Sequence, residues 1–277
     1  MIDFKTMFFL AMLSGMIMFT GSFFGQSGLI IALLVSLIVN SISYFFSDKI
    51  VLSMYRAKIL NETEMPEIQR TVMELAKGMN LPKPRVAIIS INTPNAFATG
   101  RNPENSVVAL TTGIINLLSE NELKGVIAHE LAHIKNRDTL VSVIAAVMAS
   151  VITYMGFFLR YALFSGRRDK NSAGAMLMAF IAPISATLIR LAISRNREFS
   201  ADKTGATACK NPEYLASALE KIHSNVQKFP MVNGNPATSH LFIVNPFSAR
   251  NMLSLFSTHP PVEERLKMLR NMEKQKH

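Results

Sequence analysis

The sequence predicts a mainly helical protein of the α+β class, with several membrane passes and a small β-sheet. Three observations favour this class: long apolar runs without charge, an amphipathic segment with its own helix-start signal, and short strand-like segments between turns. Hydrophobic residues make up 49% and charged residues 17% of the 277 positions. Globular domains carry roughly 25% charge, so the deficit indicates surface that faces lipid.

The net charge indicates which kind of partner the protein binds, and the cysteine content indicates the redox state of its cellular compartment. The formal net charge is +10, but the basic residues are scattered and form no run beside interleaved aromatic residues. Together with the apolar runs, this distribution favours an anionic membrane leaflet over nucleic acid as the partner of the positive charge. Cys209 is the sole cysteine, which excludes an intramolecular disulfide framework, fits a reducing compartment and favours a buried packing role.

Two apolar runs at the N-terminus predict a first transmembrane hairpin within residues 1–48. Met7–Phe24 and Leu29–Phe46 are each close to the ~20 residues that a spanning helix needs, and the Gly25–Gly28 segment between them predicts a tight turn. A cleavable signal peptide is disfavoured, because the basic n-region is weak and the second run follows directly. Lys and Arg flank the outer ends but not the connecting loop, which predicts that both ends face the cytoplasm.

A second pair of apolar runs predicts another hairpin within residues 139–194. Thr139–Leu159 and Asn171–Ile189 carry no charge, and Pro183 is expected to kink the later run. Their length favours transmembrane helices over a buried helical hairpin in a soluble protein, but leaves open whether they span the bilayer fully. In either case the polar segments on both sides of this hairpin share the cytoplasmic face.

The polar segments, residues 49–138 and 195–277, are expected to form the two parts of one domain. Asn61–Met79 predicts an amphipathic helix with Pro66 near its start. Three strand-like segments separated by turns predict a small antiparallel sheet. They are Arg85–Ser90, Ala96–Thr99 and Val107–Thr112.

A helix with a capping box carries the residues that point to chemistry. Ser119 and Glu122 predict a helix that begins directly after Ser119, and His129 and His133 lie four residues apart on one of its faces. Both imidazoles can therefore bind one Zn²⁺ at ~2.0–2.1 Å. Zinc lowers the pKa of a bound water towards ~7, and Glu130 can accept its proton as the water attacks a peptide carbonyl. The pattern predicts a metallopeptidase with one zinc ion per chain, although ligand types alone do not exclude other divalent metals.

A catalytic zinc of this kind needs a third protein ligand. The metzincin pattern would place glycine and histidine where this chain has Asn136 and Thr139, so that class is excluded. Glu198 and Asp202 follow the second apolar hairpin and lie four residues apart on one helix face. We expect Glu198 to complete the zinc shell and Asp202 to accept the N–H of a ligating histidine. The alternative is a solvated acidic pair beside basic residues.

These motifs, taken in order, resemble the HtpX group of membrane zinc metallopeptidases, which are relatives of the eukaryotic CAAX prenyl endopeptidases. The resemblance covers nearly the whole chain and includes Asn95–Gly100 and Thr258–Pro261 with Arg265. It implies a gluzincin-like fold whose active-site helix runs into the membrane. It also implies that the two histidines of the HExxH motif and the later glutamate are ligands, and that the motif's glutamate is the general base.

The same resemblance extends to substrate binding. Asn95, Ala96, Phe97 and Ala98 are similar to an edge strand that would bind an extended substrate by β-augmentation. His259 is similar to a histidine placed to stabilise the oxyanion, with a capping or core histidine as the alternative. His240 belongs to another typical stretch and is interpreted as structural.

The functional prediction is proteolytic quality control at the cytoplasmic face of the cell inner membrane, with proteins or peptides, above all damaged membrane proteins, as substrates. The quality-control role follows from the resemblance, whereas the peptidase prediction follows from the residues. An intramembrane protease is disfavoured, because Glu120, Glu122 and Lys124 indicate that the HExxH helix begins in water. Processing of prenylated proteins and a silent membrane scaffold remain alternatives, and the oligomeric state stays open.

Overall fold

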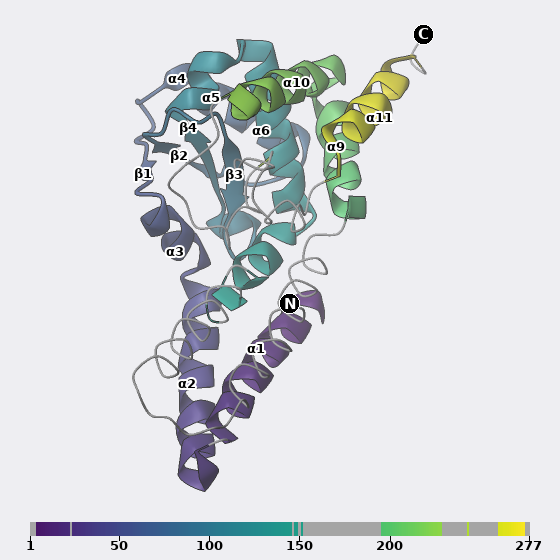
Figure 1. Cartoon of the computed structure of the whole chain (residues 1–277). Coiled ribbons are helices and arrows are strands. Elements are labelled where there is room, and N and C mark those ends of the chain that lie inside the picture. The colour runs from purple at the N-terminus through teal and green to yellow at the C-terminus, as the bar shows by residue number, and fades with distance from the viewer. Residues whose placement is uncertain are drawn as a thin grey trace.

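The computed structural model describes residues 4–22, 24–145, 147–148, 151, 195–228, 243 and 260–274. This part of the chain is mainly helical and contains one small sheet, as predicted (Figure 1). Most of the predicted second hairpin, together with His240 and His259, lies outside the described residues.

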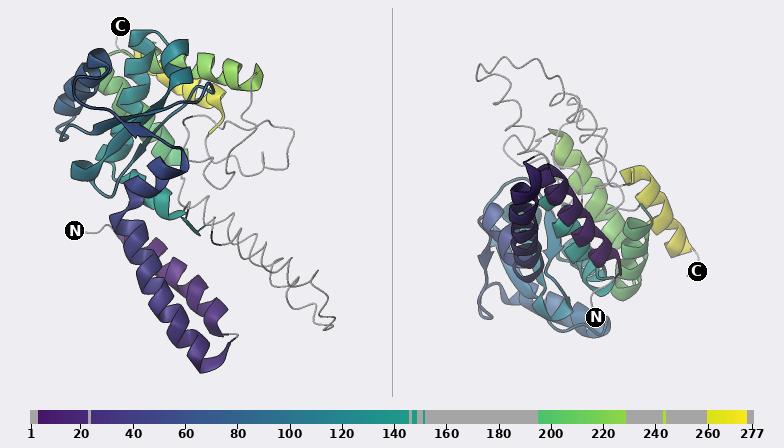
Figure 2. Two further views of the ribbon diagram at one scale, coloured as in Figure 1. Left: turned by 90° about the vertical axis from the view of Figure 1, so that its left-hand side faces the viewer. Right: turned by 90° about the horizontal axis from the view of Figure 1, so that it is seen from below.

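The first two helices lie side by side and project away from the sheet-bearing domain (Figures 1 and 2). α1 spans Phe4–Ser22 and α2 spans Gly25–Phe45. Among the described helices, α2 has the length and composition to cross a membrane, with a mean hydropathy of 2.1, and Thr6–Ser22 forms a shorter apolar helix. The two predicted apolar helices are therefore present.

The turn predicted at Gly25–Gly28 is wrong, because α2 already begins at Gly25. Gly25 has a φ of 72° and no atoms within 4 Å of an added Cβ, whereas Gly28 serves helix contact. A Cβ atom added to Gly21 would collide with Ala32 and with the backbone of Gly28. Small residues let two helix backbones approach closely, so these positions set the spacing of α1 and α2 near the turn.

The sheet has the strand order β1-β2-β4-β3 and is mixed rather than antiparallel. β2 pairs with β4 in parallel, while β1–β2 and β3–β4 are antiparallel. The prediction of a purely antiparallel sheet is wrong at the pair β2–β4. β3 follows β2 in the chain but pairs with one edge of β4, and β2 pairs with the opposite edge of β4, in parallel. The strands are β1 Lys58–Ile59, β2 Arg85–Ile89, β3 Ala96–Thr99 and β4 Val107–Thr111.

The remaining described helices surround this sheet. They are α3 Ser47–Met54, α4 Pro66–Gly78, the 3-10 helix η1 Pro103–Asn105, α5 Thr112–Leu117, α6 Glu120–Lys135, α9 Arg195–Cys209, α10 Glu213–Lys228 and α11 Val262–Lys274. α4 begins at Pro66 and not at the predicted Asn61, with Met65 before it in the left-handed conformation. Proline fits the first helical position but disfavours helix in the residue before it.

The sheet is buried on both faces. Val86, Ile88, Val108 and Leu110 point into a large apolar cluster with α4, α6, α9 and α10. The alternate residues of the same strands, with Phe97 of β3, pack against α3. Because successive strand residues point to opposite faces, this double burial explains the nearly continuous apolar sequence of β4. α6 lies on the first of these faces, beside β3.

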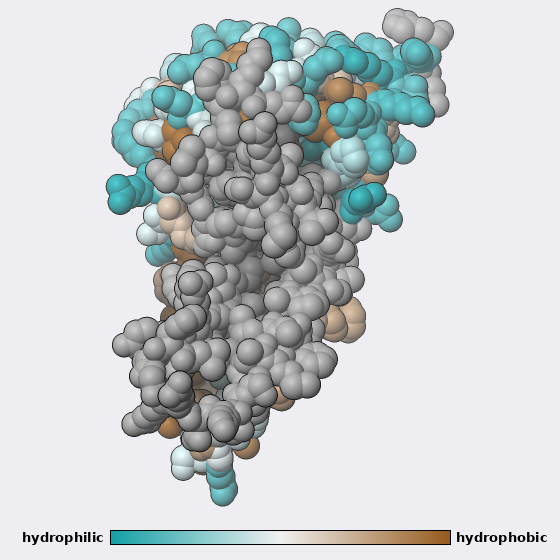
Figure 3. Space-filling view, viewed as in Figure 1, coloured by the Kyte–Doolittle hydropathy of each residue, from teal (hydrophilic) through white to brown (hydrophobic). Residues whose placement is uncertain are grey.

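The described surface divides into two kinds. Hydrophilic residues cover the end of the molecule that holds α10 and α11, whereas apolar residues show along the margins of the α1–α2 end (Figure 3). Phe9 and Leu13 of α1 pack against Leu140, Val141 and Ile144. The start of the second predicted apolar run therefore contacts the first hairpin.

Candidate metal centre

The helix that carries the two histidines begins with the predicted capping box. The Ser119 N–H donates to the Glu122 carboxylate at 2.8 Å, and the Ser119 hydroxyl accepts from the Glu122 N–H at 3.5 Å. Glu122 also accepts hydrogen bonds from Ser217 at 2.6 Å and Lys221 at 2.8 Å, both on α10. Burial by itself would raise the pKa of the Glu122 carboxyl, but these hydrogen bonds lower it to about 2. The start of α6 is thus fixed to α10.

α9 packs closely along α6 and brings the second half of the chain to the HExxH motif (Figure 1). Glu198, Asp202 and Gly205 are four and seven residues apart, so they share one helix face. A Cβ added to Gly205 would lie 2.8 Å from the backbone nitrogen of His129 and 3.0 Å from the carbonyl carbon of Ala128. Glycine at this position therefore lets α9 come near enough for its two carboxylates to reach the histidines.

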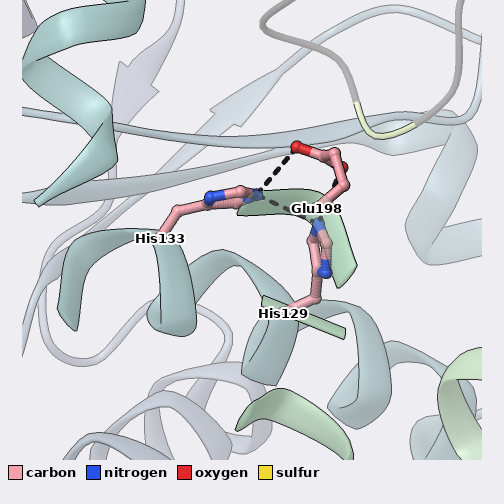
Figure 4. A group of neighbouring side chains, drawn as sticks. All are labelled: His129, His133 and Glu198. Atoms are coloured by element: carbon pink, nitrogen blue, oxygen red, sulfur yellow. Dashed lines mark hydrogen bonds and ion pairs between the residues drawn. The ribbon is translucent and has the colours of Figure 1, made fainter. Parts of the chain in front are cut away.

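His129, His133 and Glu198 converge on one point (Figure 4). The Nε2 atoms of the two histidines are 3.2 Å apart. The Glu198 carboxylate lies 3.4 Å from Nε2 of His133 and 3.8 Å from Nε2 of His129. Ligands held ~2.0–2.1 Å from a tetrahedral zinc ion are about 3.3–3.4 Å from one another. Two imidazoles and a carboxylate at this spacing fit a divalent metal ion.

The electrostatics around this group also favour a cation. Burial alone would lower the pKa of His133, but Glu198, Asp138 and Glu130 raise it to about 9. Burial raises the pKa of the Glu130 carboxyl, and Glu198 adds to that rise, while both histidines and a hydrogen bond from the Ala98 backbone oppose it. Four carboxylates surround the two imidazoles, and two of them, Asp202 and Asp138, pair with arginines. The charge that remains near the histidines is negative, and a metal ion would neutralise it.

A buried chain of polar contacts orients His129. Its Nδ1 lies 2.9 Å from the Asp202 carboxylate. Arg265 of α11 binds both oxygens of Asp202, at 2.6 and 2.8 Å, and donates to the carbonyl oxygen of Ile243 at 3.0 Å. Burial would raise the pKa of the Asp202 carboxyl, but Arg265 holds it below its usual range. The guanidinium thus keeps Asp202 ionised and its oxygen directed at the imidazole.

His133 has a corresponding contact that the sequence analysis missed. Its Nδ1 lies 3.5 Å from the Asp138 carboxylate, and the other oxygen of Asp138 lies 3.5 Å from Nε of Arg197 on α9. Arg137 has a φ of 58°, so the chain turns directly after α6 and returns Asp138 towards the histidine. An acidic residue within one turn of the end of a metal-binding helix is the signal that points to this role.

A model of peptidase family M48 matches residues 62–273. The chain belongs to this family.

Curated relatives are similar in sequence to this chain over nearly its full length. A protein named protease HtpX homolog from Syntrophobacter fumaroxidans is 52% identical over 278 residues, which cover 97% of this chain and 99% of the relative. A protein of the same name from Pyrococcus furiosus is 51% identical over 274 residues, which cover 97% of this chain and 95% of the relative. The resemblance to the HtpX group predicted from the motifs is confirmed.

A solved structure shares the fold. The crystal structure of S. mikatae Ste24p matches with a TM-score of 0.52 at 18% identity and covers 96% of this chain. This chain spans 64% of the length of Ste24p. At this identity the likeness concerns the architecture, which is that of an M48 peptidase. Family membership supports a metal-dependent peptidase, and His129, His133 and Glu198 are the group in the described part of the chain that could hold its metal.

The predicted substrate strand lies next to the metal group of this M48 peptidase. β3 is the outer strand of the sheet beyond β4, and the Ala98 backbone donates to Glu130. Asn95 precedes β3, and its side-chain oxygen accepts from the backbone N–H groups of Ala96 at 2.9 Å and Ile243 at 3.1 Å. Asn95 therefore joins the strand to Ile243, whose carbonyl oxygen Arg265 also binds. Phe97 points to the opposite, α3-facing side of the sheet.

The structure thus brings Glu130 and Asp202 together with the three candidate ligands and places the edge strand beside them. His259 and His240 lie outside the described residues. Cys209 is buried in the apolar cluster, and burial raises the pKa of its thiol to about 11. This environment confirms the prediction of a packing role, because a thiol of high pKa is a poor nucleophile near neutral pH.

Proposed function

We propose that this chain is a zinc-dependent endopeptidase anchored in a membrane, with His129, His133 and Glu198 as metal ligands. The observation that carries the proposal is the convergence of these three side chains within 4.8 Å, in a chain that belongs to a peptidase family. A zinc ion held by these residues would supply the polarisation of a water and of a substrate carbonyl. The protein supplies the remaining parts of the reaction.

Glu130 is the general base in this proposal. Its carboxylate is 4% exposed, lies on the same helix as both histidines and is held by the Ala98 backbone. It accepts a proton from the attacking water and delivers it to the leaving amine as the peptide bond breaks. Asp202 and Asp138 accept the Nδ1 protons of the histidines, which directs both Nε2 atoms to the metal. Arg265 maintains the negative charge on Asp202.

β3 is the proposed site for an extended peptide. Its inner edge pairs with β4 through Asn95 and Phe97, and the outward N–H groups of Ala96 and Ala98 already donate to Asn95 and Glu130. The carbonyl oxygens of Ala96 and Ala98 are therefore the groups on the outer edge that would accept hydrogen bonds from a substrate strand. A strand paired there would run past Glu130 and present a carbonyl carbon to the metal centre. The family resemblance gives His259 the role of oxyanion stabiliser in this scheme.

The membrane placement rests on the apolar helices. We propose that α1 and α2 form a transmembrane hairpin, that residues 139–194 form a second one, and that residues 49–138 and 195–277 make up the catalytic domain on the cytoplasmic face. The exposed apolar side chains of α2, including Ile31, Leu34 and Ile38, support this arrangement. Damaged membrane proteins are the proposed substrates, a role that follows from the likeness to HtpX proteases.

The decisive test compares the wild-type chain, Glu130→Gln and Glu120→Gln in detergent. We expect Glu130→Gln to retain about one zinc ion per chain and to cleave an unfolded model protein about 10²–10⁴-fold more slowly, because the base is lost while the ligands remain. Glu120 lies exposed on the same helix, so Glu120→Gln should keep full activity. Metal content is measured by mass spectrometry and cleavage by gel electrophoresis.

Two outcomes would contradict the proposal. Full activity of Glu130→Gln would remove the general base from the mechanism. A wild-type chain that holds no metal and cleaves nothing after zinc is added would make the scaffold interpretation the better one.

A further inference from the structure

A second polar site lies where α2 meets the sheet-bearing domain, away from the metal group. It is an open cavity of about 550 Å³. Phe45 and Phe46 at the end of α2 form its apolar wall, and Lys49, Arg85 and Arg101 contribute positive charge. Three cations and a single carboxylate in one cavity indicate a site for an anion.

The carboxylate of Asp48 neutralises Arg85, and Lys49 and Arg101 keep their positive charge. Asp48 is buried and accepts a hydrogen bond from Arg85 at 2.6 Å. Among the described residues, neither Lys49 nor Arg101 has a carboxylate partner. Their cationic groups instead lie over phenylalanine rings: Nζ of Lys49 is 5.2 Å from the ring centroid of Phe46, and Cζ of Arg101 is 5.8 Å from that of Phe45.

The position of this cavity at the end of α2 indicates which kind of anion it binds. Phe45 is the last residue of the helix that can cross a membrane, and both phenylalanines remain exposed, at 54% and 45%. Basic side chains at the end of such a helix stand at the level of lipid headgroups, while the rings stay next to the acyl chains. Arg101 also donates to the carbonyl oxygen of Phe45 at 3.1 Å, which holds its guanidinium at this boundary.

We propose that this cavity binds the phosphate of an anionic glycerophospholipid, with Lys49 and Arg101 as its partners and Phe45 and Phe46 against the acyl chains. The proposal rests on the membrane placement of α2 in the proposed function. It also has a consequence for the peptidase. Arg101 directly follows β3 and Gly100, so a lipid held by Arg101 fixes the height of the substrate strand above the bilayer.

The test measures lipid binding to the full-length chain. Delipidated protein in neutral detergent is titrated with phosphatidylglycerol or phosphatidylcholine, and bound lipid is counted by native mass spectrometry. We expect wild type to prefer phosphatidylglycerol by about tenfold or more. Lys49→Gln/Arg101→Gln should weaken phosphatidylglycerol binding roughly thirtyfold, the loss expected when two basic residues at an anionic lipid surface are neutralised.

The matched control removes the same charges at the other end of the domain. Arg70 and Lys77 lie exposed on α4, far from α3 and the end of α2 (Figure 1). Arg70→Gln/Lys77→Gln should bind phosphatidylglycerol within about twofold of wild type. Equal affinity of wild type for the two lipids, or a preference that survives in the Lys49/Arg101 variant, would overturn the proposal. Displacement of the lipid by millimolar inorganic phosphate would show that the cavity takes a free anion instead.

Vesicle flotation separates this proposal from the proposed function. Wild type and the Lys49/Arg101 variant should both float with phosphatidylcholine vesicles, because the apolar hairpin is unchanged. If both chains float and the phosphatidylglycerol preference is unaltered by the variant, the lipid site alone is wrong. If wild type fails to float with vesicles of either lipid, the membrane placement is wrong, and this inference fails with it.

Discussion

The α1–α2 hairpin and the α6–α9 pair are both closely packed two-helix units, but their exteriors and interiors differ. Side chains such as Leu34 and Ile38 of α2 are more than half exposed, whereas the contact between the hairpin helices includes Asn40, which donates to Ser14 at 2.7 Å. In the α6–α9 pair, α6 packs against apolar protein, α9 exposes polar residues such as Ser200 and Lys203 to solvent, and the buried interior holds ionised groups.

The two helix pairs differ in the partners of their buried polar groups. In the hairpin the polar groups are neutral and mostly bind within their own helix, as Ser36 does with the carbonyl of Leu33 at 2.8 Å and Ser43 with that of Val39 at 2.7 Å. In the α6–α9 pair, Asp202 and Arg265 neutralise each other from different helices. The hairpin exterior thus suits an apolar surrounding, and the metal centre holds opposite charges that largely offset one another and leave negative charge near the candidate ligands. Four substitutions test this contrast.

Arg265→Met should have the largest effect. We expect the free energy of unfolding to fall by about 3–5 kcal/mol, because Asp202 is left buried without its cation. Zinc affinity should fall about 10–100-fold, since Asp202 orients His129. Denaturant titration and competition with a chelator measure the two quantities. Arg270 on the same helix has exposed ion pairs with Glu213 and Glu220, so Arg270→Met should change stability by less than ~1 kcal/mol. Equal losses in the two variants would contradict the buried-charge interpretation.

Leu34→Lys tests the exterior of the hairpin. Leu34 lies near the middle of α2 and is 56% exposed. If lipid surrounds it, lysine should disfavour insertion by about 2.5–3.5 kcal/mol, and the fraction of chain that resists alkaline extraction from membranes should fall. Leu34→Met is the control and should stay inserted. An exterior facing water would make Leu34→Lys harmless, within ~0.5 kcal/mol, and would refute the membrane hairpin.

Gly205→Ala tests the spacing of α6 and α9. The new methyl group would press on the backbone of His129 and push α9, with Glu198 and Asp202, away from the histidines. We expect a loss of about 1–3 kcal/mol in stability together with weaker zinc binding. Gly78 at the end of α4 has no atoms within 4 Å of an added Cβ, so Gly78→Ala should be neutral or stabilise by less than ~1 kcal/mol. Unchanged zinc affinity in Gly205→Ala would show that the close approach is dispensable.

Glu122→Gln should have the smallest effect and a defined pH dependence. The variant loses the charged acceptor of the capping box and of Lys221, so stability at pH 7 should fall by ~1–2 kcal/mol. The folded pKa of about 2 lies below the unfolded value of ~4.3. The stabilisation by Glu122 is therefore fully present above the unfolded pKa and is lost as the pH falls through the folded pKa.

Wild type and Glu122→Gln should consequently differ most near neutral pH and converge between about pH 4 and pH 2. Denaturant titrations across this range measure the difference. Ser217→Ala removes a neutral hydrogen-bond donor to the same carboxylate and serves as the comparison. A difference between wild type and Glu122→Gln that stays constant down to pH 2 would contradict a role for the ionised carboxylate.

The features that depend on local periodicity and on helix-end signals can be predicted from the sequence alone. The capping box at Ser119 places the start of α6 correctly, and the four-residue spacing puts His129 and His133 on one face of that helix. The same spacing in α9 directs Glu198 and Asp202 to a common side. Charge-free runs identified α1 and α2. Each of these features is decided within about one helical turn or by composition, which the sequence records directly.

Contacts between segments far apart in the sequence become visible only in the folded chain. The parallel pairing of β2 with β4 depends on where β3 docks, and Gly21 and Gly28 let the two helices of the first hairpin approach each other closely, which no turn rule predicts. The ion pair of Arg265 with Asp202, the turn that returns Asp138 to His133 and the approach of Gly205 to the His129 backbone all join separate elements. Their formation requires the apolar core to fix the positions of α6, α9 and α11, because charges and close backbone contacts gain stability only where packing excludes water.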